Sequence, residues 1–106
     1  MLLGRVVGTV VCDRRVHTMM GSKFLIVEKV DYKGNPSGGY EVAVDAVGAG
    51  VGEVVLYTME SSARQTGITK DRPVDAVIVG IVDTVELAGE TKFQKVPIWQ
   101  APPVSF

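Results

Sequence analysis

The residues best placed to do chemistry are the glycines of a turn between two valine-rich segments. Gly48, Gly50 and Gly52 lie within five positions, and such spacing is typical of loops whose backbone N–H groups cradle a phosphate. The dinucleotide fingerprint, however, needs a third glycine at the position of Glu53 and then a helix, whereas a strand-like segment follows here. A carboxylate at Glu53 also repels phosphate. The pattern therefore favours a tight strand-to-strand turn, or a place where several backbones crowd around a symmetry axis.

Nucleophilic catalysis has few candidates in this chain. Cys12 is the only cysteine and ends a hydrophobic segment, so we expect an inert core thiol, and His17 is the only histidine and is expected in a loop. Ser61 and Ser62 have a structural explanation, because Ser62 and Gln65 fit a helix capping box. Zinc frameworks need paired Cys or His ligands. The sequence predicts no catalytic residue, no metal and no cofactor.

Carboxylates are the remaining candidates for acid–base chemistry. They are spread through expected strands and turns at Asp45, Glu53, Asp75, Asp83, Glu86 and Glu90. A folded barrel could bring two of them together for general acid–base work, but no spacing in the sequence marks such a pair. We interpret them as solvated strand faces or interface ion pairs, for which Arg64 and Arg72 are suitable partners.

Composition points to a small, oligomeric domain. The chain has 106 residues, of which 46% are hydrophobic, and a net charge of −1, so it carries much apolar side chain for a domain of this size. Subunit contacts are an ordinary way to cover such an excess. The single basic pair, Arg14–Arg15, is too little for a nucleic-acid surface, and no apolar run approaches the ~20 residues of a membrane span. With no secretory signal in the sequence, the expected location is cytoplasmic.

The dominant local signal is β-structure. Strands are expected over residues 2–12, 23–30, 40–47, 53–59 and 76–82. A hairpin loop is expected over 31–39, and a short capped helix over 61–67. In the third strand Tyr40, Val42, Val44 and Ala46 share one face, while Glu41 and Asp45 lie on the other. The fifth strand, AVIVGIV, is apolar on both faces, so we expect a neighbouring subunit to cover one of them.

These elements predict an all-β domain, a small five-stranded barrel with one short helix. The barrel domain is expected to span residues 1–90. Residues 91–106 form a Pro-rich C-terminal extension that we expect to run extended. Trp99 and Phe106 in this extension suggest that it docks on a surface.

The chain also resembles a known family, the pentameric vertex proteins of bacterial microcompartment shells, of the ethanolamine-utilisation and carboxysome type. The resemblance is carried by LLGRVVGTVV, VAVDAVGAGVGEVVL, SSARQ and RPVDAVIVGIVD, which occur in the family's order and spacing and cover most of residues 2–83. Two features depart from the family pattern: Glu60 stands where glycine is usual, and the segment after Asp83 matches poorly.

The resemblance implies a barrel similar to the oligonucleotide-binding fold, assembled as a homopentameric ring that caps a shell vertex. It implies a structural protein of the microcompartment shell in the cytoplasm, with hexameric shell proteins as partners and neither nucleic acid nor membrane. The residues themselves leave other readings open: a barrel that binds a small ligand or single-stranded nucleic acid, a small carboxylate enzyme, or a hexameric ring.

From the turn pattern and the resemblance, we expect Gly48, Ala49 and Gly50 to lie near the five-fold axis and to shape any central pore. A side chain such as lysine there would bring five like charges together. The expected subunit-interface residues are Glu53, Ser61, Ser62, Arg64, Asp75, Ile78 and Ile81.

Overall fold

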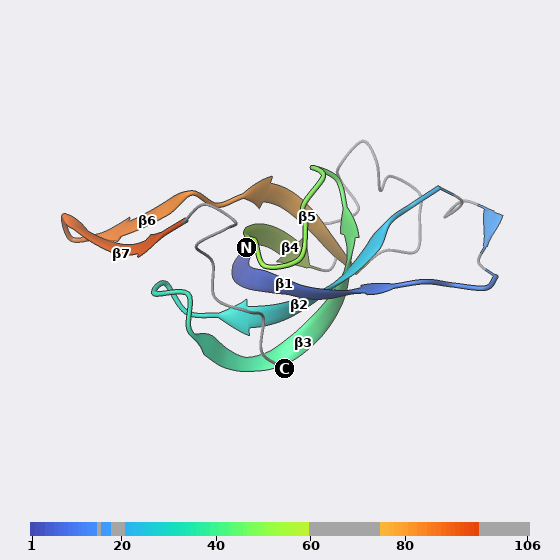
Figure 1. The fold of residues 1–106 in the computed structure, drawn as a ribbon, viewed down its shortest axis with the longest axis horizontal. Coiled ribbons are helices and arrows are strands. Elements are labelled where there is room, and N and C mark those ends of the chain that lie inside the picture. The colour runs from blue at the N-terminus through green and yellow to red at the C-terminus, as the bar shows by residue number, and fades with distance from the viewer. Residues whose placement is uncertain (15, 18–20, 60–74, 96–106) are drawn as a thin grey trace.

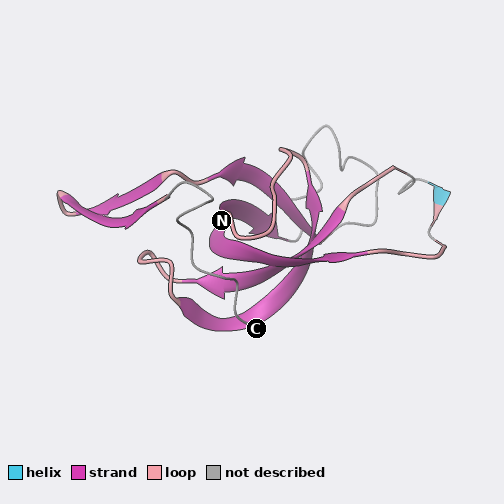
Figure 2. Cartoon of the chain, in the orientation of Figure 1, coloured by secondary structure: helices cyan, strands magenta, loops and turns pink. Residues whose placement is uncertain are grey.

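The computed structural model describes residues 1–14, 16–17, 21–59 and 75–95. Within these ranges the chain forms seven strands (Figure 2). They are β1 (Leu2–Val10), β2 (Phe24–Val30), β3 (Pro36–Asp45), β4 (Val54–Met59), β5 (Ala76–Ile81), β6 (Thr84–Leu87) and β7 (Glu90–Gln94). The helix expected over 61–67 lies outside the described residues.

Five of the strands close into a barrel in the order β1-β2-β3-β5-β4 (Figure 1). The neighbours pair antiparallel except β3 and β5, which run parallel and pair Val44 with Val77 and Asp45 with Ile78. Closure gives each of the five strands a partner on both sides, although β3 meets β5 only at these two residues. The expected all-β, five-stranded barrel is confirmed.

β3 begins earlier than the sequence suggests. It pairs with β2 from Pro36, which lies opposite Val30 after an irregularity in the register, so the loop is shorter than the expected 31–39. Gly38 and Gly39 have φ values of 98° and 100° and lie within the strand, where their conformational freedom is accommodated by the irregular pairing. Pro36, Gly38 and Gly39, which lie in the expected loop 31–39, therefore belong to a distorted strand, whereas Gly34 stays in the loop.

The main core fills the interior of the barrel. Its fully buried members come from all five strands and from the turn after β3: Val6, Leu25, Val27, Ala43, Ala49, Val55, Tyr57, Ala76 and Ile78. On β3 the residue that enters this core is Ala43, whereas Tyr40 and Val42 on the opposite face are 55% and 53% exposed. The more apolar face of β3 is thus the outer face of the barrel.

The hairpin β6–β7 was not expected from the sequence. It joins Leu87 to Glu90 through Ala88 and Gly89, whose φ values are 53° and 81°. A two-residue turn with two positive φ values suits a hairpin, but Ala-Gly is a weaker signal for it than Asn-Gly. The hairpin extends away from the barrel in Figure 1, and β7 crosses the domain boundary expected at residue 90.

Gly4 allows the closest approach inside the barrel. A Cβ at this position would collide with Val27 Cγ1 and lie 2.9 Å from Tyr57 Cε1. The space is taken by the side chain of Val27 and by the ring of Tyr57, which is fully buried. Its hydroxyl has no hydrogen-bond partner among the described residues, and burial raises the pKa of the Tyr57 phenol.

We therefore predict that Gly4→Ala destabilises the fold by about 1–3 kcal/mol, because the added methyl overpacks a filled interior. Gly8→Ala is the control in the same strand, since a Cβ there meets only Ile26, at an ordinary 3.5 Å. Urea unfolding of both variants measures the difference. Equal stability of Gly4→Ala and Gly8→Ala would contradict this account of the core.

Candidate functional site

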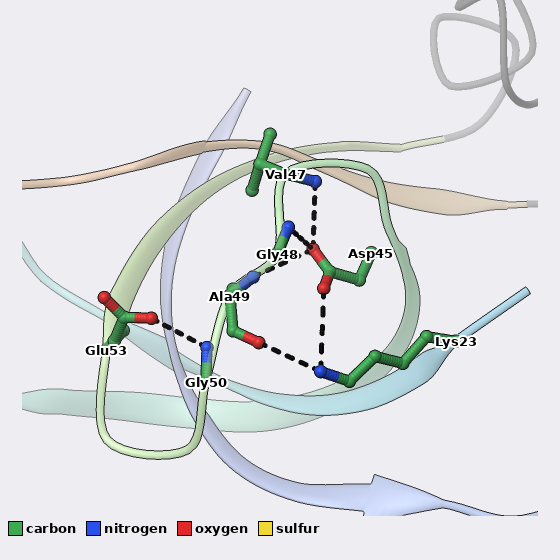
Figure 3. A network of polar contacts seen from close by, with 7 residues as sticks. All are labelled: Lys23, Asp45, Val47, Gly48, Ala49, Gly50 and Glu53. Carbon is green, nitrogen blue, oxygen red and sulfur yellow. Dashed lines mark hydrogen bonds and ion pairs between the residues drawn. The ribbon is translucent and has the colours of Figure 1, made fainter.

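The turn between β3 and β4 is organised by the carboxylate of Asp45, the last residue of β3 (Figure 3). Asp45 Oδ1 accepts hydrogen bonds from the backbone N–H groups of Val47, Gly48 and Ala49, at 3.1, 3.0 and 3.2 Å. The Asp45 side chain is 3% exposed. A buried carboxylate needs such partners, so the turn and the charge stabilise each other.

Two further side chains complete the turn. Glu53 Oε1 accepts the N–H of Gly50 at 2.7 Å. Lys23 Nζ, from the residue before β2, donates to the carbonyl oxygen of Ala49 at 3.4 Å and lies 3.9 Å from Asp45 Oδ2. Figure 3 shows these groups converging on the turn from three segments of the chain. With the three hydrogen bonds to Asp45, the bond from Gly50 means that the backbone N–H groups of four consecutive residues, 47–50, donate to carboxylates.

This geometry opposes phosphate binding. The N–H groups of residues 47–50 already donate to two carboxylates of the same chain. A phosphate would have to displace these carboxylates and face their negative charge. The arrangement supports the interpretation of residues 45–53 as a structural turn.

The glycines of the turn differ in what the fold requires of them. Gly48 and Gly52 have φ values of 79° and 96°, in the left-handed region that favours glycine. Gly50 lies outside that region, and a Cβ there would meet only Glu53 Oε1, at 3.5 Å. Ala49 is buried, and its methyl group belongs to the barrel core. The fold of one chain therefore explains Gly48 and Gly52 but not Gly50.

A salt bridge joins the turn to the end of the hairpin. Lys95 Nζ lies 2.8 Å from Glu53 Oε2, and the N–H of Lys95 donates to the carbonyl of Asp83 at 2.7 Å. The hydrogen bond from Lys95 lowers the pKa of Glu53 against the opposing effect of burial. The same bond raises the pKa of Lys95. Glu53 thus connects Gly50 to Lys95, the last described residue.

The structure does not place all of the predicted interface residues at the surface. Ser61, Ser62 and Arg64 lie outside the described residues. Ile78 is fully enclosed in the core of its own chain, so contrary to expectation its side chain is not available to a neighbouring subunit. The alternation of β5 turns this residue inward.

The other candidates are placed differently. Ile81 is half-buried against the core, Asp75 is exposed just before β5, and Glu53 is engaged within its own chain. Cys12 is partly exposed beyond the end of β1 rather than in the core. His17 is exposed in a loop, as expected.

Sequence reasoning missed Lys23 and Lys95 as parts of the site. Lys95 lies 42 residues from Glu53 along the chain, and no local pattern connects the two. Lys23 lies 26 residues before Ala49, whose carbonyl oxygen it contacts. Among the described residues, no group of three or more potential metal ligands comes together. In the same ranges, no helix has the length and apolar character needed to cross a membrane.

Comparisons with known proteins agree with the resemblance. The family model described as "Ethanolamine utilisation protein EutN/carboxysome" matches residues 1–83. The carboxysome shell vertex protein CcmL of Gloeobacter violaceus is 46% identical, over 90% of this chain and 95% of the relative. The bacterial microcompartment shell vertex protein EutN of Escherichia coli is 45% identical, over 90% of this chain and 100% of the relative.

Solved structures of shell proteins also match this chain. The structure of Gloeobacter violaceus CcmL superposes with a TM-score of 0.84, over 90% of this chain and 98% of that one. The GrpN pentameric microcompartment shell protein from Rhodospirillum rubrum is 45% identical, with a TM-score of 0.76 over 83% of this chain and 100% of that one. Fold and matches together define a small β-barrel of the shell-protein class. The chain belongs to the EutN/CcmL family of shell vertex proteins.

Family membership does not favour the alternative functions that the sequence left open. The named relatives are structural shell proteins, so neither an enzyme nor a single-stranded nucleic-acid-binding module is favoured. Relatives from a carboxysome and from an ethanolamine-utilisation compartment match almost equally well. The similarity therefore identifies the family and not the cargo.

The salt bridge predicts how stability depends on pH. Glu53 has a lowered native pKa, so its contribution is present above the ordinary value of 4.5 and is lost as pH falls through the native value. Lys95 has a raised pKa, so its contribution is present below 10.5 and is lost as pH rises through the native value. We expect Glu53→Gln to flatten the loss of stability on acidification.

Urea unfolding between about pH 3 and 7 measures this effect. Glu90→Gln is the control, because Glu90 also pairs with a lysine, Lys92, at 3.0 Å, but its side chain is 74% exposed. The wild type and the Glu90→Gln variant should lose stability in parallel. A Glu53→Gln profile that follows them would show that the salt bridge contributes nothing measurable.

Proposed function

We propose that this chain forms a homopentameric ring that caps the five-fold vertices of a bacterial microcompartment shell. Its role is structural, and the chain carries out no reaction of its own. The observation that carries this proposal is the match over nearly the whole chain to shell vertex proteins, one of them solved as a pentamer. Flat sheets of hexameric shell proteins need five-fold points to close, so hexameric shell proteins are the proposed partners.

The barrel is suited to a ring because its outer surface retains apolar side chains. Val47 and Val51 in the turn are 39% and 49% exposed, and Leu2 at the start of β1 is 37% exposed. Residues of this kind are typical of surfaces that neighbouring subunits cover. A heterologous ring buries two different patches of each subunit, one against the next copy on either side.

Within the ring, we place the turn of Gly48, Ala49 and Gly50 near the five-fold axis. Because Ala49 turns its methyl group into its own core, the turn presents mainly backbone to its surroundings. Such a surface allows five copies to approach closely without bulk or charge. Ser61, Ser62 and Arg64, with Asp75 and Ile81, are proposed to contact the adjacent subunit, and Arg64 suits a carboxylate there.

A substitution at Gly50 can distinguish the stability of one folded chain from the stability of the ring. A methyl group at Gly50 has room within one chain, so Gly50→Ala should leave the free energy of unfolding of the monomer nearly unchanged. At an axis, five added methyl groups would meet and weaken the ring. We expect the Gly50→Ala pentamer to dissociate at a higher protein concentration than the wild type and Gly8→Ala, measured by native mass spectrometry on dilution. Undiminished pentamer would place the turn away from the axis.

The vertex role is tested by mass and by shell closure. The native protein is expected at five times the 11.3 kDa mass of the chain. Mixed with a hexameric shell protein, it should convert open sheets or tubes into closed polyhedral particles, which electron microscopy distinguishes. A monomer would remove the basis of the proposal, and a pentamer that leaves the sheets open would remove the vertex role.

A further inference from the structure

A groove of about 570 Å³ lies on the outer face of the barrel, over β1, β2 and β3. It is lined by Val7, Gly8, Ile26, Tyr40, Glu41 and Val42. Val7 forms a buried floor, whereas Tyr40 and Val42 are more than half exposed. The groove is therefore an apolar recess that its own described residues leave open.

The barrel restricts how a peptide segment can occupy this groove. β1 pairs with β2 and β4, β2 with β1 and β3, and β3 with β2 and β5. The groove lies over the face that these paired strands form, so an occupant seated in it packs side chains onto that face. Pro-rich segments bind in this way, in grooves that contain aromatic rings.

Tyr40 is suited to such a contact. The neighbouring Glu28 carboxylate, through its charge and a hydrogen bond, raises the pKa of the Tyr40 phenol. The Tyr40 hydroxyl thus has a partner in Glu28, while 55% of the residue stays exposed. Gly8 adds no side chain to the groove, which lets a segment approach the sheet closely.

The chain itself contains a segment of matching chemistry. Residues 96–106, VPIWQAPPVSF, have three prolines, two aromatic residues and no charged residue. They lie outside the described residues and begin directly after Lys95, which is fixed to the barrel through Glu53 and Asp83. In polyproline II form the segment spans up to ~34 Å at about 3.1 Å per residue. Glu53, the partner of Lys95, accepts the N–H of Val6, which directly precedes Val7 of the groove, so the groove is within reach.

We propose that residues 96–106 dock in the outer-face groove of their own subunit, with Trp99 packed against the exposed Tyr40 and Val42. An uncharged Pro-rich segment and an apolar recess then cover one another's surface. The salt bridge between Lys95 and Glu53 sets the point from which the segment leaves the barrel. This docking goes beyond the vertex role and is independent of ring formation.

Trp99 is the only tryptophan of the chain, so its fluorescence reports on this segment alone. In the native full-length protein we expect blue-shifted emission and weak quenching by acrylamide. Val42→Glu places a charge in the groove and should shift the emission to the red and raise the quenching constant about twofold, as water reaches the indole. Val16→Glu is the matched control, because Val16 is 57% exposed and Val42 53%. Tyr40→Thr provides a second groove variant should Val42→Glu fail to fold.

The outcomes distinguish docking on the same subunit from a ring contact in the groove and from docking on a neighbouring subunit. Red-shifted Trp99 in the groove variants alone, with the pentamer mass retained, supports the docking. Solvent-exposed Trp99 in the wild type, or an equal effect of the groove and control variants, overturns it. A Val42→Glu protein that loses its pentamer while Trp99 stays protected would assign the groove to the ring contact instead. Trp99 protection that disappears when wild-type rings dissociate would assign the segment to a neighbouring subunit.

Discussion

The pairing of β3 with β5 is the constraint on which the rest of the structure depends. It is the parallel pair that closes the barrel, and it places Asp45 opposite Ile78 at the end of β3. Closure buries Ile78 in the core and brings the Asp45 carboxylate to the point where the chain leaves the sheet. Because this carboxylate is nearly buried, the backbone of residues 47–49 must fold around it to supply hydrogen bonds.

The same closure explains why a small protein of this composition exposes apolar side chains. The interior of a five-stranded barrel is narrow, and it is filled by one ring such as Tyr57 together with valines and alanines. Gly4 leaves room for Val27 and Tyr57, because a side chain there would collide with both. Side chains that cannot enter, such as Tyr40 and Val42, remain on the outside. A protein built in this way is prepared for association, either with other copies or with its own terminal segment.

Glu53 connects parts of the chain that are distant in sequence. One carboxylate oxygen holds the N–H of Gly50 and the other holds Lys95. Phe93 of β7 also packs close to Gly34 in the loop between β2 and β3. The salt bridge and the bond from Lys95 to Asp83 fix the point where the C-terminal segment begins. The turn assigned to the ring axis and the segment assigned to the outer groove are thus joined through one residue. This link gives the family barrel a fixed exit point for an extension.

The sequence by itself determined the fold class and the family, because valine-rich alternation, turn residues and the order of motifs are local properties that survive in any context. It also excluded a phosphate loop through the position of Glu53. Local patterns could not show which face of β3 enters the core, since Ala43 is small and Tyr40 and Val42 are more hydrophobic. Nor could they show the Ala88–Gly89 hairpin, the burial of Ile78 or the pairing of Glu53 with Lys95. Closure of the barrel determines which side chains are buried, and the folded chain brings residues that are distant in sequence into contact. Only the tertiary structure therefore decided these features.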